Sequence, residues 1–259
     1  QELEESRVEL KKLQLNKESF FAIMSHEIRT PLNAIKGISD ILKSKNENVE
    51  KSNLLELMDY SANHLLALVN NILDFTKLND GVFSLNYTDF NIRKSFNSLF
   101  KMNERLALEK GLALEIIISK NIPQYVYGDK NRINQIVLNL LNNSIEHTAN
   151  GHVKMEVLGK YNPVKENEFL LEIIISDTGK WIEKKIADKL FQKYASSNSS
   201  KNSVGLGLTI SKGLVELMNG EITFTTKQNI GTTFFITLPL AIPIHNIDNV
   251  EIIKGTDLD

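Results

Sequence analysis

The chain contains no cysteine. This excludes a disulfide framework, a thiolate nucleophile and a metal site with cysteine ligands, and it fits a reducing compartment. The sequence also lacks any apolar run near the roughly 18 residues that a membrane-spanning helix needs. Its 30 basic and 32 acidic residues leave a formal net charge of −2. A charge this close to zero offers no electrostatic case for binding nucleic acid or an anionic membrane.

What is present is typical of a folded protein: 259 residues, of which 42% are hydrophobic and 24% charged. This length allows one large domain or two modest ones. The first residues are charged and helical rather than signal-like, and their pattern starts without a helix cap. We therefore expect a fragment of a longer protein, with an upstream region that leads into this helix.

The first third of the chain predicts two long amphipathic helices. In the first helix, spacings of three, four and seven separate the apolar residues Leu3, Leu10, Leu13, Phe20 and Met24. After a polar break a second helix with the same kind of seam runs to about Leu78, and the sequence "NDG" ends it. Two such helices form a hairpin. Because each helix buries only one stripe, we expect a homodimeric four-helix bundle.

The first helix carries the stretch "FFAIMSHEIRTPLNAI", in which His26 stands beside Glu27. In the heptad register His26 lies off the apolar seam. Pro31 has no N–H and crowds the carbonyl of Glu27, so we expect a kink close to His26. The apolar spacing resumes at Leu32, which argues against a simple helix end. A lone histidine on a helix is most often a solvated surface residue, so other motifs must decide its role.

Beyond Gly81 strands and helices alternate. Apolar segments predict strands at 112–119, 152–159, 169–177, 220–227 and 231–240. Helices are expected at about 92–110, 132–147, 184–191 and 206–218. This pattern predicts an α+β domain, a two-layer sandwich in which helices cover one face of a mixed sheet. The tail from Ile244 has little periodicity and is interpreted as a linker.

Two polar motifs of this second part suit a nucleotide. "NLLNNSIEHT" places Asn139 and Asn143 one helical turn apart, where neutral amides can hold a hydrated Mg²⁺ and phosphate oxygens. Asparagines also occur on solvated faces. "ISDTGKW" ends a strand with Asp177 and turns at Gly179. The carboxylate could accept a hydrogen bond from an exocyclic amine such as adenine N6, or form a simple Asx turn.

Two further motifs lie near the end of the domain. "SVGLGLTIS" places Gly205, Leu206 and Gly207 where a helix opens, and backbone N–H groups there can bind phosphate. A glycine pair also occurs in simple loops. The Ser/Asn-rich segment ahead of it is interpreted as a mobile lid. "GTTF" begins the final strand and contains Thr233.

In their order and combination these motifs resemble the sensor histidine kinases of two-component systems, over residues 1 to about 240. "SHEIRTPL" is similar to the H box of that family, "NLLNNSIEHT" to the N box, "DTG" to the start of the G1 box, "LFQKY" to the F box and "GLGL" to the G2 box. The resemblance implies a dimerisation and phosphoacceptor hairpin and an ATP-binding domain like that of gyrase and MutL. The implied divisions are a coiled-coil signalling helix (1–18), the hairpin (19–82), the ATP-binding domain (83–243) and a linker or tail (244–259).

The resemblance assigns roles residue by residue. His26 would be the phosphoacceptor, and Glu27 would orient its imidazole and accept its proton. Thr30 would help to position water when the protein dephosphorylates a partner. The implied ligands are ATP and Mg²⁺, with Asn143 on the metal. The other implied nucleotide-binding residues are Asn139, Asp177 with Thr233 nearby through water, Gly179, Gly205, Leu206 and Gly207.

The chain departs from the family pattern on the nucleotide side. Trp181 stands at the second glycine of the G1 box, where it either occupies nucleotide space or acts as a lid contact. Glu146 replaces the usual lysine of the N box, and a carboxylate there would repel triphosphate. The lid is also shorter than is common. These changes indicate weakened, altered or regulated nucleotide binding.

The resemblance favours an ATP-dependent protein histidine kinase that passes its phosphoryl group to an aspartate of a receiver domain. We expect it in the cytoplasm, connected to an upstream sensor domain, and the full-length protein could be membrane-anchored. The alternative is a nucleotide-impaired pseudokinase that acts as a dimeric scaffold, a phosphatase or a phosphoacceptor for a receiver. An ATP-driven clamp like MutL is disfavoured, because Asn139 stands where such enzymes carry a glutamate that activates water.

Overall fold

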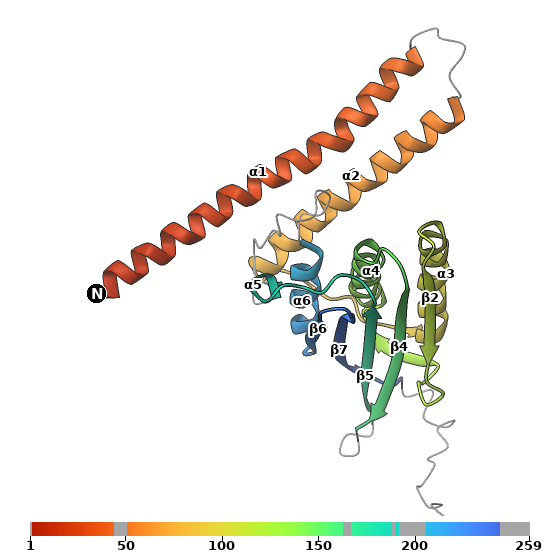
Figure 1. Cartoon of the computed structure of the whole chain (residues 1–259). Coiled ribbons are helices and arrows are strands. Elements are labelled where there is room, and N and C mark those ends of the chain that lie inside the picture. Colours follow the sequence, from red (N-terminus) through yellow and green to blue (C-terminus); the bar gives the residue numbers. More distant parts are fainter. Residues whose placement is uncertain (1, 44–50, 163–166, 188–189, 192–205, 244–259) are drawn as a thin grey trace, which may run out of the picture. The chain divides into compact units, whose positions relative to one another are not determined.

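The computed structural model describes residues 2–43, 51–162, 167–187, 190–191 and 206–243. The chain divides into two compact units (Figure 1). One comprises Gln1–Phe83 and Asp188–Ile210, and the other comprises Ser84–Ala187 and Ser211–Asp259. The prediction of a helical hairpin followed by an α+β domain is confirmed. None of the described helices combines the length and the apolar character that a bilayer crossing requires.

The hairpin consists of α1 (Glu2–Lys43) and α2 (Lys51–Asn79). Buried residues repeat every seven positions, at Met24, Pro31 and Ile38 on α1 and at Ser61, Leu68 and Phe75 on α2. Seven residues are two turns of a supercoiled helix, so this repeat keeps one stripe of each helix facing inward. Leu32, which the sequence placed in the seam, is instead 51% exposed.

Proline acts only locally in α1. The helix runs without a break through Pro31 (Figure 1). The missing N–H of Pro31 leaves the carbonyl of Glu27 without its donor four residues on. One residue earlier, the Thr30 hydroxyl donates to the carbonyl of His26 at 3.1 Å. The predicted bend therefore neither ends nor divides the helix.

The second unit is built on a mixed seven-stranded sheet. Its strands are β1 (Thr88–Asn91), β2 (Ala113–Ile118), β3 (Tyr125–Gly128), β4 (His152–Tyr161), β5 (Glu168–Asp177), β6 (Glu221–Lys227) and β7 (Gly231–Ala241). The order is β1-β3-β7-β5-β4-β2, and β6 also pairs with β7. The pair β2–β4 is parallel, and the other described pairs are antiparallel.

One face of this sheet is buried. The helices of this part of the chain are α3 (Ile92–Glu109), α4 (Lys130–His147), α5 (Lys184–Ala187) and α6 (Leu206–Leu217). Of α6, the residues from Ser211 onward belong to the sheet unit. Along β5 every second residue is buried, from Phe169 to Asp177, and α3 and α4 pack on the sheet. The sequence missed β1 and β3, because four-residue strands are too short to show a period. The predicted helix at 184–191 is described only as α5, and most of the predicted lid lies outside the described residues.

Polar groups hold α4 at both ends. At its start the Asp129 side chain is only 3% exposed; its Oδ1 accepts from the Arg132 amide at 3.1 Å and its Oδ2 from the Asn86 amide at 2.8 Å. At its end the Lys110 ammonium donates to the carbonyls of Ile145 at 3.0 Å and Glu146 at 3.1 Å. A cation there also complements the helix dipole. This helix carries the N-box residues.

We expect Asp129→Ala to lower the free energy of unfolding by about 2 kcal/mol, because one cap bond and one buried loop bond are lost together. Urea unfolding of the chain would measure the change. Asn91→Ala is the matched control, since Asn91 caps α3 through one bond to the Lys94 amide. Equal losses in the two variants would contradict the special role of Asp129.

Candidate functional site

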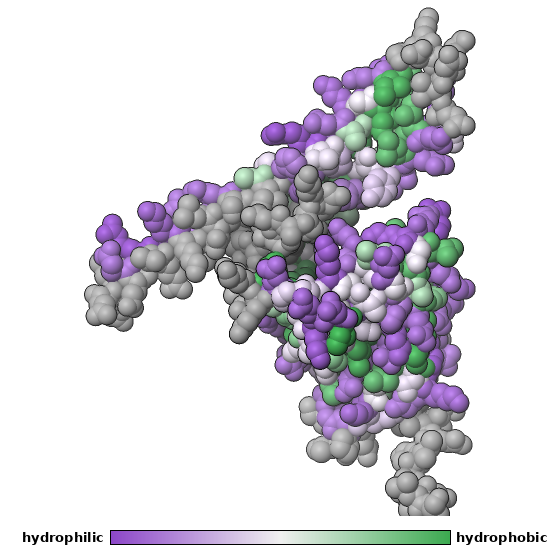
Figure 2. Space-filling view, viewed as in Figure 1, coloured by the Kyte–Doolittle hydropathy of each residue, from purple (hydrophilic) through white to green (hydrophobic). Residues whose placement is uncertain are grey.

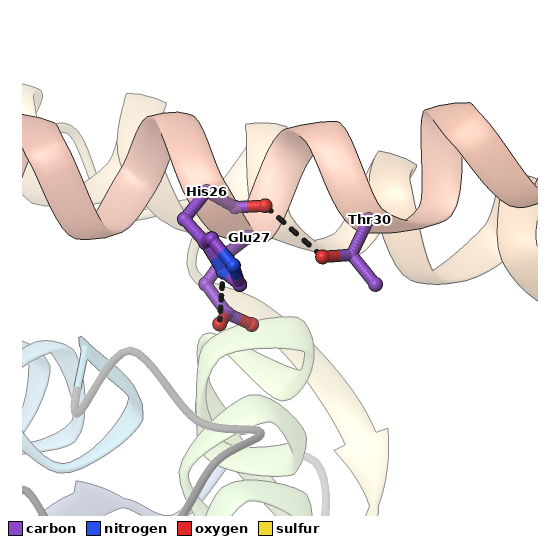
Figure 3. A network of polar contacts seen from close by, with 3 residues as sticks. All are labelled: His26, Glu27 and Thr30. Carbon is purple, nitrogen blue, oxygen red and sulfur yellow. Dashed lines mark hydrogen bonds and ion pairs between the residues drawn. The ribbon is translucent and has the colours of Figure 1, made fainter.

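The predicted phosphoacceptor His26 is accessible. Its side chain is 74% exposed, whereas that of Glu27 is 15% exposed. The imidazole Nδ1 lies 3.7 Å from Glu27 Oε1, an ion-pair distance slightly longer than a hydrogen bond (Figure 3). The carboxylate thus faces one ring nitrogen, and Nε2 has no hydrogen bond to any described residue. This arrangement suits a nucleophile whose second nitrogen is held by an acceptor.

Thr30 lies one turn beyond His26 on the same helix (Figure 3). Its hydroxyl donates to the backbone of His26 rather than to the imidazole. The hydroxyl is exposed and keeps lone pairs that could accept from water. Its predicted part in positioning water stays a prediction.

Asp177 is the central group of the second unit. It ends β5 and is 8% exposed. Its Oδ1 accepts from the Gly179 amide at 2.9 Å and from the Thr232 amide at 3.4 Å. Its Oδ2 accepts from the Ser144 hydroxyl at 3.1 Å. Oδ2 keeps a free lone pair that could accept a hydrogen bond from an exocyclic amine.

Opposing effects set the protonation of this carboxyl group. Burial raises the pKa of Asp177 above its ordinary 3.8. The hydrogen bonds from Gly179, Ser144 and Thr232 and the charge of His147 lower that pKa. The donors therefore limit the cost of keeping a buried charge.

Two glycines let the backbone close around Asp177. A Cβ at Gly179 would lie 2.6 Å from the carbonyl oxygen of His147 and 3.0 Å from Asp177 Oδ1. Gly231 has φ +127°, and a Cβ there would collide with the carbonyl of Asp177. No other residue type fits either position without moving the backbone.

The strand register shows which threonine of β7 lies beside Asp177. Asp177 pairs with Thr232, and Thr233 pairs with Ser176. Since alternate side chains point to opposite faces of a sheet, Thr232 shares the buried face of Asp177 and Thr233 does not. Thr232 therefore lies beside Asp177 and contacts it through its amide, and the predicted place of Thr233 near the nucleotide stays a prediction. The apolar run "LEIIIS" hides this parity, because both faces of β5 carry isoleucine.

Ser144 was also missed. It lies on the buried face of α4, one turn after Leu140, and is 1% exposed. A serine on an otherwise apolar helix face needs a partner. That requirement is the signal that could have pointed to Ser144, but only the fold identifies Asp177 as the partner.

The two amides of α4 lie one turn apart and are both half-buried. The Asn139 amide donates to the Ser211 hydroxyl of α6 at 3.3 Å. The Asn143 side chain makes no hydrogen bond to any described residue, so its oxygen is available. Amide oxygens are suitable Mg²⁺ ligands, and Mg²⁺ takes few of them from a protein. The pair fits the predicted metal and phosphate roles.

The glycine-rich motif is described only in part. Helix α6 begins at the buried Leu206, and Gly207 is its second residue. Gly205 lies outside the described residues. The predicted helix opening is thus present where the motif places it, and phosphate binding there stays a prediction.

Two of the three departures from the family pattern, Trp181 and Glu146, are on the surface. Trp181 is 41% exposed, and Glu146 is exposed at the end of α4. The backbone beside the tryptophan is fixed, because the Ile182 amide donates to the Thr226 hydroxyl of β6 at 2.9 Å. That hydroxyl lies 3.1 Å from the hydroxyl of Thr232. Trp181 therefore stands on a turn tied to the surroundings of Asp177.

Comparisons with known families agree with this geometry. Residues 16–81 match the His Kinase A (phospho-acceptor) domain. Residues 128–242 match the histidine kinase-, DNA gyrase B- and HSP90-like ATPase family. The chain carries a sensor histidine kinase core. In this core the first match contains His26 and the second contains Asp177.

Individual relatives extend over both regions of the kinase core. The autoinducer 2 sensor kinase/phosphatase LuxQ of Vibrio vulnificus is 35% identical over 226 residues, which cover 85% of this chain and 26% of LuxQ. The histidine-protein kinase BarA of Escherichia coli is 33% identical, covering 86% of this chain and 25% of BarA. The core thus spans about a quarter of these relatives.

A solved structure shares the fold. Full-length ShkA, crystallised in complex with AMPPNP, matches with a TM-score of 0.62 and 25% identity. The match covers 87% of this chain and 46% of that one. The similarity includes both the hairpin and the sheet unit.

The raised pKa of Asp177 makes a prediction for stability. The folded chain binds a proton at this carboxyl at higher pH than the unfolded chain, so the group disfavours folding as pH rises through its folded pKa. As the pH is raised from about 4 to about 7, the stability of Asp177→Asn should therefore increase relative to that of wild type. Thermal unfolding at the two pH values measures this. Asp89→Asn, at an exposed carboxylate of β1, is the control, and an equal change in both variants would contradict the prediction.

Proposed function

We propose that this chain is an ATP-dependent protein histidine kinase. It phosphorylates its own His26 and passes the phosphoryl group to an aspartate of a response-regulator receiver domain. The observation that carries this proposal is the exposed His26, whose Nδ1 faces the Glu27 carboxylate. An exposed Nε2, with a carboxylate facing Nδ1 at 3.7 Å, leaves the ring free to act as a nucleophile.

The step is a phosphoryl transfer from ATP to imidazole. The Nε2 lone pair forms a bond to the γ-phosphorus, and the bond from that phosphorus to the bridging oxygen of ADP breaks. The proton on Nδ1 moves to Glu27, so the phosphorylated ring stays neutral. Catalysis then rests on positioning and on neutralising phosphate charge.

The nucleotide site of this proposal centres on Asp177. Its Oδ2 would accept a hydrogen bond from the N6 amine of adenine, while Oδ1 already accepts hydrogen bonds from two backbone amides. Asn143 would ligate Mg²⁺, and Asn139 would support the phosphates together with Gly205, Leu206 and Gly207. Bound Mg²⁺ would neutralise part of the triphosphate charge. The match to ShkA, which binds AMPPNP, supports a nucleotide here. ATP as donor places the reaction in the cytoplasm.

The hairpin leaves apolar surface for a partner. Leu66, Val69 and Leu73 of α2 follow spacings of four and three and are exposed. Near the turn Ile41 and Leu55 are exposed as well, and Figure 2 shows an apolar patch on this end of the hairpin. A second copy of the hairpin would bury these residues in a four-helix bundle. We propose this homodimer, with a receiver domain and an upstream sensor as further partners.

His26→Gln should abolish labelling by γ-labelled ATP, because glutamine has no nucleophilic nitrogen. The label on the wild-type chain should be acid-labile and base-stable, as a phosphoramidate is. His64→Gln is the matched control, since His64 lies on the same hairpin and stacks on Tyr60 at 6.4 Å between ring centroids. It should leave the label unchanged.

Retained label in His26→Gln would exclude His26 as the acceptor. Binding of Mg·ATP without any label would separate nucleotide recognition from transfer. Failure of wild type to bind millimolar Mg·ATP would instead indicate a pseudokinase whose function lies in the hairpin.

Trp181→Gly should tighten Mg·ATP binding, by about tenfold, because it removes bulk from the turn after Gly179. Calorimetry on the whole chain would measure the affinity. Trp181→Phe keeps an aromatic ring and should change the affinity less. Weaker binding by the glycine variant would show that the indole is a contact to nucleotide or lid.

A further inference from the structure

The described groups around Asn143 and Asp177 include two carboxylates, with His147 as the positive charge beside Asp177. Asp177 and Glu146 are both carboxylates, and Glu146 is exposed less than one turn after Asn143. A triphosphate placed beside Asn139 and Asn143 would meet these negative charges. Phosphate sites need cations or oriented N–H donors to offset such repulsion. The question is which basic side chain supplies the charge.

Lys110 does not meet this need. Its ammonium donates to the carbonyls of Ile145 and Glu146 at 3.0 and 3.1 Å. These bonds close the C-terminal end of α4, and releasing them would expose two carbonyl groups without donors. Lys110 is thus committed to the helix end.

Lys180 has the opposite character. It directly follows Gly179 and is exposed, and its ammonium makes no ion pair or hydrogen bond with any described residue. Its amide donates to the carbonyl of His147 at 3.4 Å. Gly179 lies so close to the same carbonyl that a Cβ would be 2.6 Å from it. The turn that carries Lys180 is therefore fixed against the last turn of α4.

This contact joins the backbone of Lys180 to that of His147, the residue that follows Glu146 in α4. The family pattern has a lysine at position 146. In this chain the negative charge, Glu146, is on α4, and the positive charge, Lys180, is on the turn after β5. A lysine stem is long and flexible, so its ammonium can reach positions on either side of such a contact.

We propose that Lys180 binds the phosphates of the nucleotide and replaces the cation that position 146 lacks. This inference rests on the proposed function, since it takes ATP as the ligand. It makes Glu146 and Lys180 a linked pair in which Lys180 offsets the repulsion from Glu146. The Asp177 carboxylate recognises the base, and Lys180 recognises the charge of the triphosphate.

Lys180→Ala should weaken Mg·ATP binding by about tenfold, as expected for the loss of one charge-assisted contact. Binding of adenosine, measured by competition, should change little because adenosine carries no phosphate. Lys180→Arg should keep most of the affinity. Lys120→Ala, at an exposed lysine in the loop after β2, is the control and should bind Mg·ATP like wild type. Added salt should weaken wild-type binding more than Lys180→Ala binding.

A double variant tests the link between positions 146 and 180. Glu146→Lys combined with Lys180→Ala should restore Mg·ATP affinity to the wild-type level or above. Rescue together with the ATP-specific loss supports the proposal. An equal loss of adenosine and ATP would overturn it, because Lys180 would then only support the turn around Asp177.

Two results separate this inference from the proposed function. If wild type binds Mg·ATP and Lys180→Ala binds it equally well, the role of Lys180 is wrong and the kinase proposal stands. If wild type binds no Mg·ATP, both fail together.

Discussion

The sheet unit depends on the burial of one carboxylate, that of Asp177. A buried charge is costly unless hydrogen bonds satisfy it. Here the donors come from three separate parts of the chain: Ser144 on α4, Gly179 in the turn after β5, and Thr232 on β7. Satisfying the carboxylate therefore fixes the helix, the turn and the neighbouring strand together. The close approach also requires glycine at 179 and 231.

In the hairpin the candidate reactive group is exposed rather than buried. This group, His26, has to stay exposed, so it cannot be held by packing. The seven-residue repeat of Met24, Pro31 and Ile38 buries one stripe of α1 and leaves His26 outside it. The imidazole is then oriented only by its neighbour Glu27 and by the backbone of a regular helix. A rigid helix thus presents the group without enclosing it.

The departures from the family pattern lie on the exposed side of the nucleotide region. Glu146, Lys180 and Trp181 are exposed, whereas Ser144, Asp177 and Thr232 are buried. Exposed positions can change charge or size without disturbing the hydrogen bonds of the carboxylate. In the proposed nucleotide site, recognition of the base and binding of the phosphates would therefore depend on different residues. Altered phosphate contacts need not remove base recognition.

The sequence by itself determined the hairpin and the main strands, because a seven-residue repeat and short apolar runs are local patterns. It also located His26, Glu27, Asn139, Asn143 and Asp177 through their motifs. Strands β1 and β3, the pairing of Asp177 with Thr232 rather than Thr233, and the bond from Ser144 were decided by the tertiary structure. These features depend on the register between strands distant in sequence, and "LEIIIS" is apolar on both faces. Which oxygen of Asp177 keeps a free lone pair follows only from the three donors that the fold brings together.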